Sequence, residues 1–155
     1  MYFAHAARLR RRKAEVFCFG TRLTRVSREL GRRDVDRAFE EVAGRVVDWE
    51  GGTRIGDAVR ELVRRRDLQG LLRGAVVVVV SDGLERGDPE VLGREMGRLA
   101  LLAHRIVWVN PLKGDPSYEP LARGMQAALR HVDLFTSGHD LASFEDLAEL
   151  IPELG

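Results

Sequence analysis

The sequence has little cysteine and no long apolar run. Cys18 is its single cysteine, so no internal disulfide can form and nothing indicates an oxidising compartment. The longest apolar run, residues 75–80, is far shorter than the ~20 residues that cross a membrane as a helix. The N-terminus carries no apolar signal-peptide core. We therefore expect a cytoplasmic protein with no membrane association.

An excess of charge of one sign is also missing. The chain has 25 basic and 24 acidic side chains, a formal net charge of +1, which argues against a dedicated nucleic-acid binder. Its 45% hydrophobic and 32% charged residues are typical of a soluble globular protein. A length of 155 residues without linkers or repeats predicts one domain, residues 1–155.

What the chain does have is an alternation of strand and helix patterns. Residues 75–80, an alanine and five valines with no polar face, predict a buried parallel strand. Other strands are predicted at 14–19, 23–26, 105–109 and 132–135. Helices are predicted to begin near Val35, Ile55, Pro89, Pro120 and Leu141. This order predicts an α/β fold with a mostly parallel sheet flanked by helices.

The glycine-rich loop at 51–56 does not have the residues of a nucleotide site. A phosphate-binding loop needs a lysine after its last glycine, but Asp57 follows Gly56. The dinucleotide fingerprint needs glycine at the third position, where Thr53 stands. Cys18 lies inside a predicted strand, as an inert core thiol does. We assign no catalytic residue and expect no enzyme.

Two oxygen ligands remain that suit a hard cation. Asp82 follows the valine strand and Thr53 lies in the glycine-rich loop. Mg²⁺ accepts such ligands together with several waters. A structural alternative stays open, because Asp-Gly is a common turn dipeptide and Thr53 or Gly52 would lie near the cap of the following helix.

Motifs along nearly the whole chain resemble the von Willebrand factor type A (VWA) domain, and within it the bacterial CoxE-like subfamily. The matching stretches are EVFCFGTRLT (15–24), GGTRIG (51–56), SDG (81–83), RGDP (86–89), WVNPL (108–112), YEPLARGM (118–125) and VD (132–133). The resemblance implies a Rossmann-like three-layer sandwich with a metal-ion-dependent adhesion site at the carboxyl edge of the sheet. In that site an Asp-x-Ser-x-Ser motif, a threonine and an aspartate hold Mg²⁺, and a partner's carboxylate completes the coordination. The threonine matches Thr53 and the aspartate matches Asp82.

The resemblance also implies a function. It is that of a non-catalytic protein-binding module that acts with a MoxR-type AAA+ ATPase in the maturation of metalloenzymes. Arg54, Asn110 and Lys113 would then shape the partner surface around the metal. Two alternatives stay open: a metal-free scaffold, and a small α/β hydrolase or phosphotransfer enzyme that uses Asp82.

The sequence departs from the family pattern at its start. It has no Asp-x-Ser-x-Ser motif, and residues 1–9 correspond to the second half of the family's first helix. We therefore expect an N-terminally truncated domain without its first central strand, and a site that binds Mg²⁺ weakly or not at all. The missing strand would lie between residues 14–19 and 75–80. Three arrangements would compensate for it: direct pairing of these two segments, a homodimer, or a longer natural protein.

Overall fold

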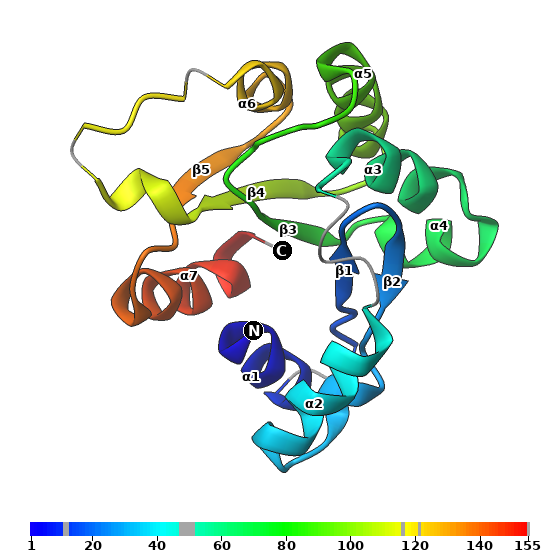
Figure 1. The fold of residues 1–155 in the computed structure, drawn as a ribbon, viewed down its shortest axis with the longest axis vertical. Helices are drawn as coiled ribbons and strands as arrows, with labels where there is room; N and C mark the ends of the chain where they lie inside the picture. Colours follow the sequence, from blue (N-terminus) through cyan, green and yellow to red (C-terminus); the bar gives the residue numbers. More distant parts are fainter. Residues whose placement is uncertain (11–12, 47–51, 116, 121, 155) are drawn as a thin grey trace. The chain divides into compact units, whose positions relative to one another are not determined.

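The computed structural model describes residues 1–10, 13–46, 52–115, 117–120 and 122–154 (Figure 1). It divides into two compact units, an N-terminal unit, Met1–Gly52, and a C-terminal unit, Thr53–Gly155. The N-terminal unit contains α1 (Tyr2–Arg10), β1 (Phe17–Phe19), β2 (Leu23–Arg25), the 3₁₀ helix η1 (Glu29–Gly31) and α2 (Val35–Arg45). The C-terminal unit contains α3 (Ile55–Arg64), α4 (Arg66–Leu72), β3 (Val76–Val80), α5 (Pro89–Ala100), β4 (Arg105–Asn110), the 3₁₀ helix η2 (Pro111–Gly114), α6 (Arg123–Leu129), β5 (Leu134–Ser137) and α7 (Leu141–Leu154).

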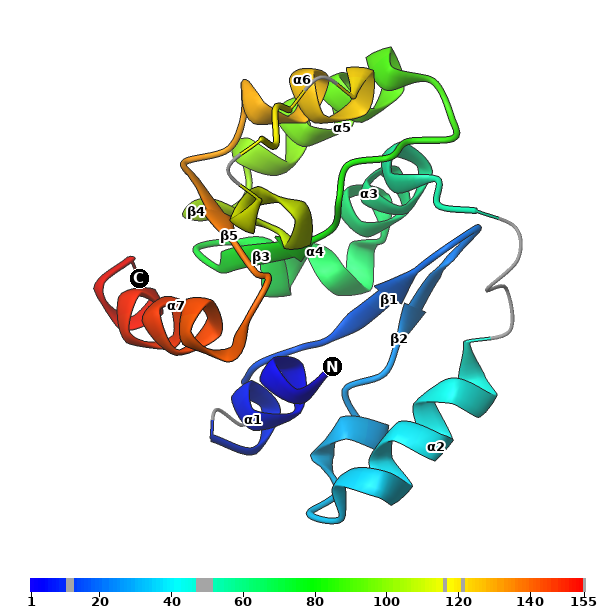
Figure 2. The same cartoon turned by 60° about the vertical axis from the view of Figure 1, so that its left-hand side comes forward.

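A parallel three-stranded sheet organises the C-terminal unit. Its strand order is β3-β4-β5, with Val78 beside Val107 and Val109 beside Thr136. Helices α5 and α6 lie over one face of this sheet and α7 over the other, as both ribbon views show (Figures 1 and 2). The predicted α/β class, with a parallel sheet between helices, is confirmed.

The core of this unit is centred on β4. Four consecutive side chains of the strand, Ile106 to Val109, are buried, and Leu92, Met96 and Leu99 of α5 are buried with them. Helices α3 and α5 approach closely at Gly56, where a Cβ atom would lie 2.9 Å from the backbone nitrogen of Leu92. A side chain at position 56 would therefore separate the two helices.

The valine strand is where the sequence prediction of burial is wrong. Only Val79 of β3 is buried, and Val80 is 44% exposed. The reason is topological, because β4 is the one strand paired with β3 among the described residues. The sequence also missed α4 and placed the last strand two residues too early, since β5 runs from Leu134 to Ser137.

The N-terminal unit is a helix, a hairpin and a second helix. Strands β1 and β2 pair antiparallel, with Cys18 opposite Thr24, and form a sheet of their own. Direct pairing of 14–19 with 75–80 is therefore absent from the described strand pairings. Asp34 caps α2 by accepting a hydrogen bond from the Arg37 amide at 3.1 Å, as its position predicts.

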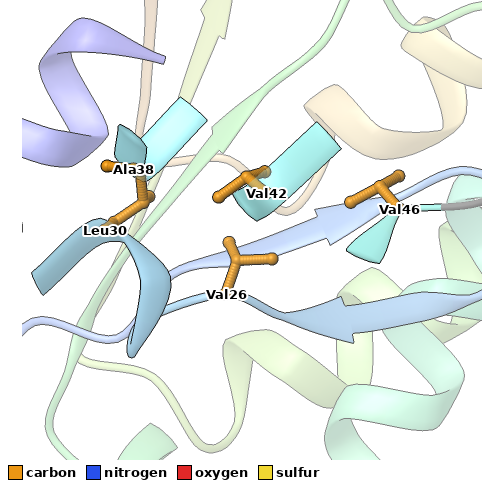
Figure 3. Close-up of a cluster of buried hydrophobic side chains, with 5 residues drawn as sticks. All are labelled: Val26, Leu30, Ala38, Val42 and Val46. Atoms are coloured by element: carbon orange, nitrogen blue, oxygen red, sulfur yellow. The ribbon is translucent and has the colours of Figure 1, made fainter. Parts of the chain in front are cut away.

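A small apolar cluster holds this unit together. Its buried side chains come from the end of the hairpin, η1 and α2, and point toward one another in Figure 3: Val26, Leu30, Ala38, Val42 and Val46. Among the described helices of either unit, none combines the length and the apolar character that crossing a membrane requires.

Candidate metal site at the sheet edge

The Asp82 loop leaves the carboxyl end of β3 and is held by the neighbouring strand. Trp108 Nε1 donates a hydrogen bond to the Ser81 carbonyl at 2.9 Å, and Asn110 Nδ2 donates to the Asp82 carbonyl at 3.2 Å. Asp82 Oδ1 accepts from the Leu84 amide at 3.0 Å. The turn role of Asp82 is therefore real, and it uses one oxygen of the carboxylate.

Two glycines let the loop pack tightly. Gly83 has a φ of +80°, and a Cβ atom there would lie 2.6 Å from Met125 Sδ. A Cβ atom at Gly124 would lie 2.6 Å from Glu85 Cβ and 2.7 Å from the Gly83 carbonyl oxygen. The start of α6 therefore rests directly against this loop.

Asn110 is the buried centre of the site's hydrogen bonds. Besides its bond to Asp82, its Nδ2 donates to Tyr118 Oη at 2.8 Å, and its Oδ1 accepts from the Leu112 amide at 2.8 Å. Burial raises the pKa of Tyr118 and the negative charge of Asp82 raises it further, against the opposing effect of the Asn110 hydrogen bond. Burial and the Asp82 charge thus both favour the neutral form of the Tyr118 phenol.

Thr53 lies beside the same loop. Its carbonyl accepts a hydrogen bond from the Arg86 amide at 3.0 Å, which ties the start of the C-terminal unit to the Asp82 loop. Thr53 lies directly before Arg54, the N-cap of α3, and so near the cap as the structural alternative expects, while the Arg54 side chain makes no capping bond. Gly51, the first residue of the GGTRIG motif, lies outside the described residues.

Glu85 takes the capping role, and sequence reasoning missed it. Its Oε2 accepts from the Gly56 amide at 2.6 Å and its Oε1 from the Gly87 amide at 2.5 Å. A carboxylate is favourable there because the first amides of α3 carry partial positive charge. No local sequence signal could have shown this, since Glu85 and Gly56 are 29 residues apart.

The donor atoms at this edge fit a largely hydrated Mg²⁺. Both Glu85 oxygens are engaged, which leaves the second carboxylate oxygen of Asp82 and the hydroxyl of Thr53. A carboxylate and a hydroxyl with several waters are ligands that Mg²⁺ accepts. Within the described part of the chain, no three His, Cys, Asp or Glu side chains are grouped so that they could hold a metal ion. Asp82 and Thr53 are therefore the two candidate ligands at this edge, and a metal bound there would take its other ligands from water.

The surroundings of Asp82 are more apolar than the sequence suggested. Leu84 is 61% and Leu112 50% exposed, next to the half-exposed Val80. Of the residues expected to shape a partner surface, Asn110 is buried and so cannot contact a partner directly. Lys113 Nζ donates to the Phe135 carbonyl at 2.5 Å and lies 4.5 Å from the centre of the Phe135 ring. Arg54 lies 3.7 Å from Asp57.

A serine, histidine and aspartate cluster lies beyond the end of β5. Ser137 Oγ lies 2.6 Å from His139 Nδ1, and His139 Nε2 lies 3.3 Å from Asp140 Oδ2. Asp140 Oδ1 also accepts from the Ser143 amide at 2.9 Å, as a residue that caps a helix does. All these contacts are exposed, and the cap accounts for the position of Asp140 at the start of α7.

The comparisons with known proteins agree with the architecture. A family model described as "VWA domain containing CoxE-like protein" matches residues 1–144. Neither a curated protein nor a solved structure matches the chain. The family indicates a protein-interaction module.

Proposed function

Because this chain belongs to the family of CoxE-like proteins that contain a VWA domain, we propose that it binds a protein partner at the carboxyl edge of the β3-β4-β5 sheet, without catalysis. The observation that carries the proposal is the way in which Asp82 is held. Trp108 and Asn110 bind the main chain on either side of it, so the carboxylate is fixed at an edge rimmed by exposed leucines. Exposed apolar side chains beside a fixed polar group mark an interaction site.

A weakly held Mg²⁺ is part of this proposal. Thr53 would hold the ion directly or through water, and Asp82 would hold it through water. The ion would supply a positive charge to which a carboxylate of the partner binds. With two protein ligands, the affinity for the ion alone is low, and the partner's carboxylate raises it.

Family membership supports the kind of partner. We propose a MoxR-type AAA+ ATPase, or its client, in the maturation of a metalloenzyme. We also propose that the chain forms homodimers, through a surface other than the carboxyl edge of the sheet.

A thermal-shift titration with Mg²⁺ and Mn²⁺ tests the metal. An ion at 100 times its dissociation constant stabilises the fold by ~2.7 kcal/mol. Asp82→Asn should abolish the shift, because it keeps an oxygen for the Leu84 amide but removes the charge. Thr53→Val, which keeps the shape and removes the hydroxyl, should weaken the shift.

The matched control is Asp115→Asn. Asp115 is another exposed aspartate in a turn, where it accepts from the Ser117 amide at 2.8 Å. This variant should leave the titration unchanged. A flat titration of the unaltered chain would contradict the metal site and favour the metal-free scaffold.

Binding and turnover separate the module from the enzyme. The module predicts that Asp82→Asn loses binding to an AAA+ ATPase of the MoxR type, while a general phosphatase or esterase substrate is not hydrolysed by either form. Hydrolysis that disappears in Asp82→Asn would favour the hydrolase or phosphotransfer alternative.

A further inference from the structure

The two candidate ligands, Thr53 and Asp82, come from segments that are far apart in the chain. Thr53 begins the short segment that leads into α3, and Asp82 lies in the loop that follows β3. Two oxygen ligands serve one Mg²⁺ only when they are held at a suitable separation, because this ion tolerates little departure from its preferred geometry. The contacts that fix these two segments against each other therefore decide whether Thr53 and Asp82 can act on one ion.

Glu85 is the side chain that joins the two segments. Its Oε2 accepts a hydrogen bond from the Gly56 amide at 2.6 Å, which holds the end of the segment that starts with Thr53. The next residue holds the other end, because the Arg86 amide donates to the Thr53 carbonyl at 3.0 Å. In the described part of the chain, no other side chain forms a hydrogen bond between residues 53–56 and the loop at 81–88.

The same carboxylate is also bound within the Asp82 loop. Oε1 of Glu85 accepts from the Gly87 amide at 2.5 Å, and the Glu85 amide donates to the Gly83 carbonyl at 2.9 Å. Between these residues, the Leu84 amide donates to Asp82 Oδ1 at 3.0 Å. Asp82 and Glu85 thus belong to one hydrogen-bonded loop, so a displacement of Glu85 is expected to displace the Asp82 carboxylate.

The hydrogen bond from Gly56 favours a charged acceptor. The Gly56 amide is one of the first amides of α3, which have no partner within the helix and carry partial positive charge. A hydrogen bond from an amide to a carboxylate is stronger than one to a neutral oxygen. The link between the two segments therefore depends on the negative charge of Glu85 as well as on the length of its side chain.

We propose that Glu85 is a positioning residue, which joins the start of α3 to the loop after β3 and so sets the separation of Thr53 and Asp82. Glu85 acts without touching the ion, since both of its carboxylate oxygens accept bonds from backbone amides. Its effect on binding rests on the proposed metal site, whereas the link between the two segments is measurable without metal.

Amide exchange of the 155-residue chain in EDTA tests the link. Glu85→Ala removes the carboxylate but keeps the Cβ atom that lies against Gly124, so the chain should still fold. The Arg86 amide keeps its acceptor, the Thr53 carbonyl, in this variant. It should nevertheless exchange about tenfold faster, because Glu85 no longer holds the segment that carries Thr53. Unchanged exchange of the Arg86 amide would overturn the proposal.

A titration with Mn²⁺ measures the consequence for binding. Glu85→Ala should raise the dissociation constant for Mn²⁺ about tenfold, as the loss of a residue that orients metal ligands does. A merely structural role would lower the unfolding temperature and leave this constant unchanged, and that result would overturn the proposal. If the unaltered chain binds no Mn²⁺, the metal part of the proposed function fails, and the exchange of the Arg86 amide alone decides whether Glu85 holds the two segments.

Glu90→Ala is the matched control. Glu90 is also an acidic residue in the first turn of a helix, α5, but it is exposed, and its side chain forms no hydrogen bond among the described residues. The control should leave the exchange and the titration unchanged. Equal effects of Glu85→Ala and Glu90→Ala would assign the change to a lost charge near a helix and would overturn the proposal.

A second variant keeps the test decisive if Glu85→Ala does not fold. Glu85→Gln keeps the length of the side chain and one acceptor oxygen but removes the charge. It should change the exchange of the Arg86 amide and the Mn²⁺ dissociation constant in the same direction, by less than tenfold. A Glu85→Gln chain that matches the unaltered chain in both measurements would contradict the role of the charge.

Discussion

Each of the two units of this chain is stabilised internally in a different way. In the C-terminal unit, the backbone of β4 is paired on both sides and its side chains Ile106 to Val109 are buried between helices. In the N-terminal unit, side chains bind the backbone beyond the short hairpin. Ser27 Oγ accepts from the Val16 amide at 2.8 Å, and His5 Nε2 lies 2.8 Å from the Arg32 carbonyl. A long ladder needs few such bonds, whereas a hairpin of three-residue strands needs them at its ends.

The two units also differ in how completely the carboxylate of a buried glutamate is hydrogen-bonded. Glu95 in α5 receives bonds of 2.9 Å from Arg98 Nη1 to both carboxylate oxygens, and Arg60 Nε lies 3.6 Å from it. Glu29 in the N-terminal unit binds Arg45 through Oε1 at 2.8 Å, while its buried Oε2 has no hydrogen-bond partner among the described residues. The unit with the larger core also satisfies its buried charge more completely.

The largest expected effect comes from separating the units. Residues 53–155 should fold alone, because the sheet and the helices on both faces lie within them. Residues 1–52 should not, since chains this short bury too little apolar surface. Circular dichroism and thermal unfolding of the two fragments check this. A cooperative transition in fragment 1–52 would break the comparison.

In the C-terminal unit, Trp108→Ala should lower the free energy of unfolding by about 3–5 kcal/mol, because Trp108 is fully buried. Trp108→Phe retains most of the ring volume but leaves the Ser81 carbonyl without its donor, so about 1–3 kcal/mol is expected. Denaturant unfolding measures both. Equal losses in the two variants would mean that the hydrogen bond to Ser81, and not the packing, dominates.

In the N-terminal unit, Ser27→Ala should destabilise local structure by about 1–3 kcal/mol, since the Val16 amide loses its acceptor. Amide exchange should show faster opening of the hairpin and unchanged protection in β4. Ser117→Ala, at an exposed turn serine, is the control and should stay within about 0.5 kcal/mol of the original protein. Faster exchange in both units after Ser27→Ala would show that they unfold together.

The smallest effect is a pH dependence. Burial alone would raise the pKa of Glu95, but the hydrogen bond and charge of Arg98, together with the charges of Arg64 and Arg60, lower it below the ordinary value of 4.5. A lowered folded-state pKa contributes stability that is present above about pH 4.5 and is lost as the pH falls through the folded-state value. Glu95→Gln should flatten the stability profile in that acidic range. An unchanged profile would contradict the pairing.

The sequence predicted the features that depend on neighbouring residues or on the order of the elements. Asp34 before a periodic apolar pattern predicted α2, and Asp82-Gly83 predicted a turn. The order of strands and helices predicted the α/β class. That Thr53 and Asp82 share one metal site stays a prediction; the backbone of Thr53 binds Arg86, in the loop that follows Asp82.

What the sequence could not predict depends on distant contacts. The valines of β3 are apolar on both faces, which is equally compatible with a central strand and with an open edge. Nothing in the sequence distinguishes Glu85 from an ordinary surface acid, and only the fold places it at the start of α3. Asn110 was expected at a partner surface, but it is buried, with hydrogen bonds to Asp82 and Tyr118 from other segments of the chain.

The close packing at Gly83 and Gly124 sets a rule for sequence variation. A change at either position would push α6 away from the Asp82 loop, and no flexible side-chain end could move aside at Gly124, where the obstacles are Glu85 Cβ and a backbone oxygen. Two glycines 41 positions apart in the chain thus serve the same close approach of α6 to this loop, and the positive φ of Gly83 also favours glycine there. We expect the Asp82 carboxylate to be held in the same way in homologues that keep both glycines.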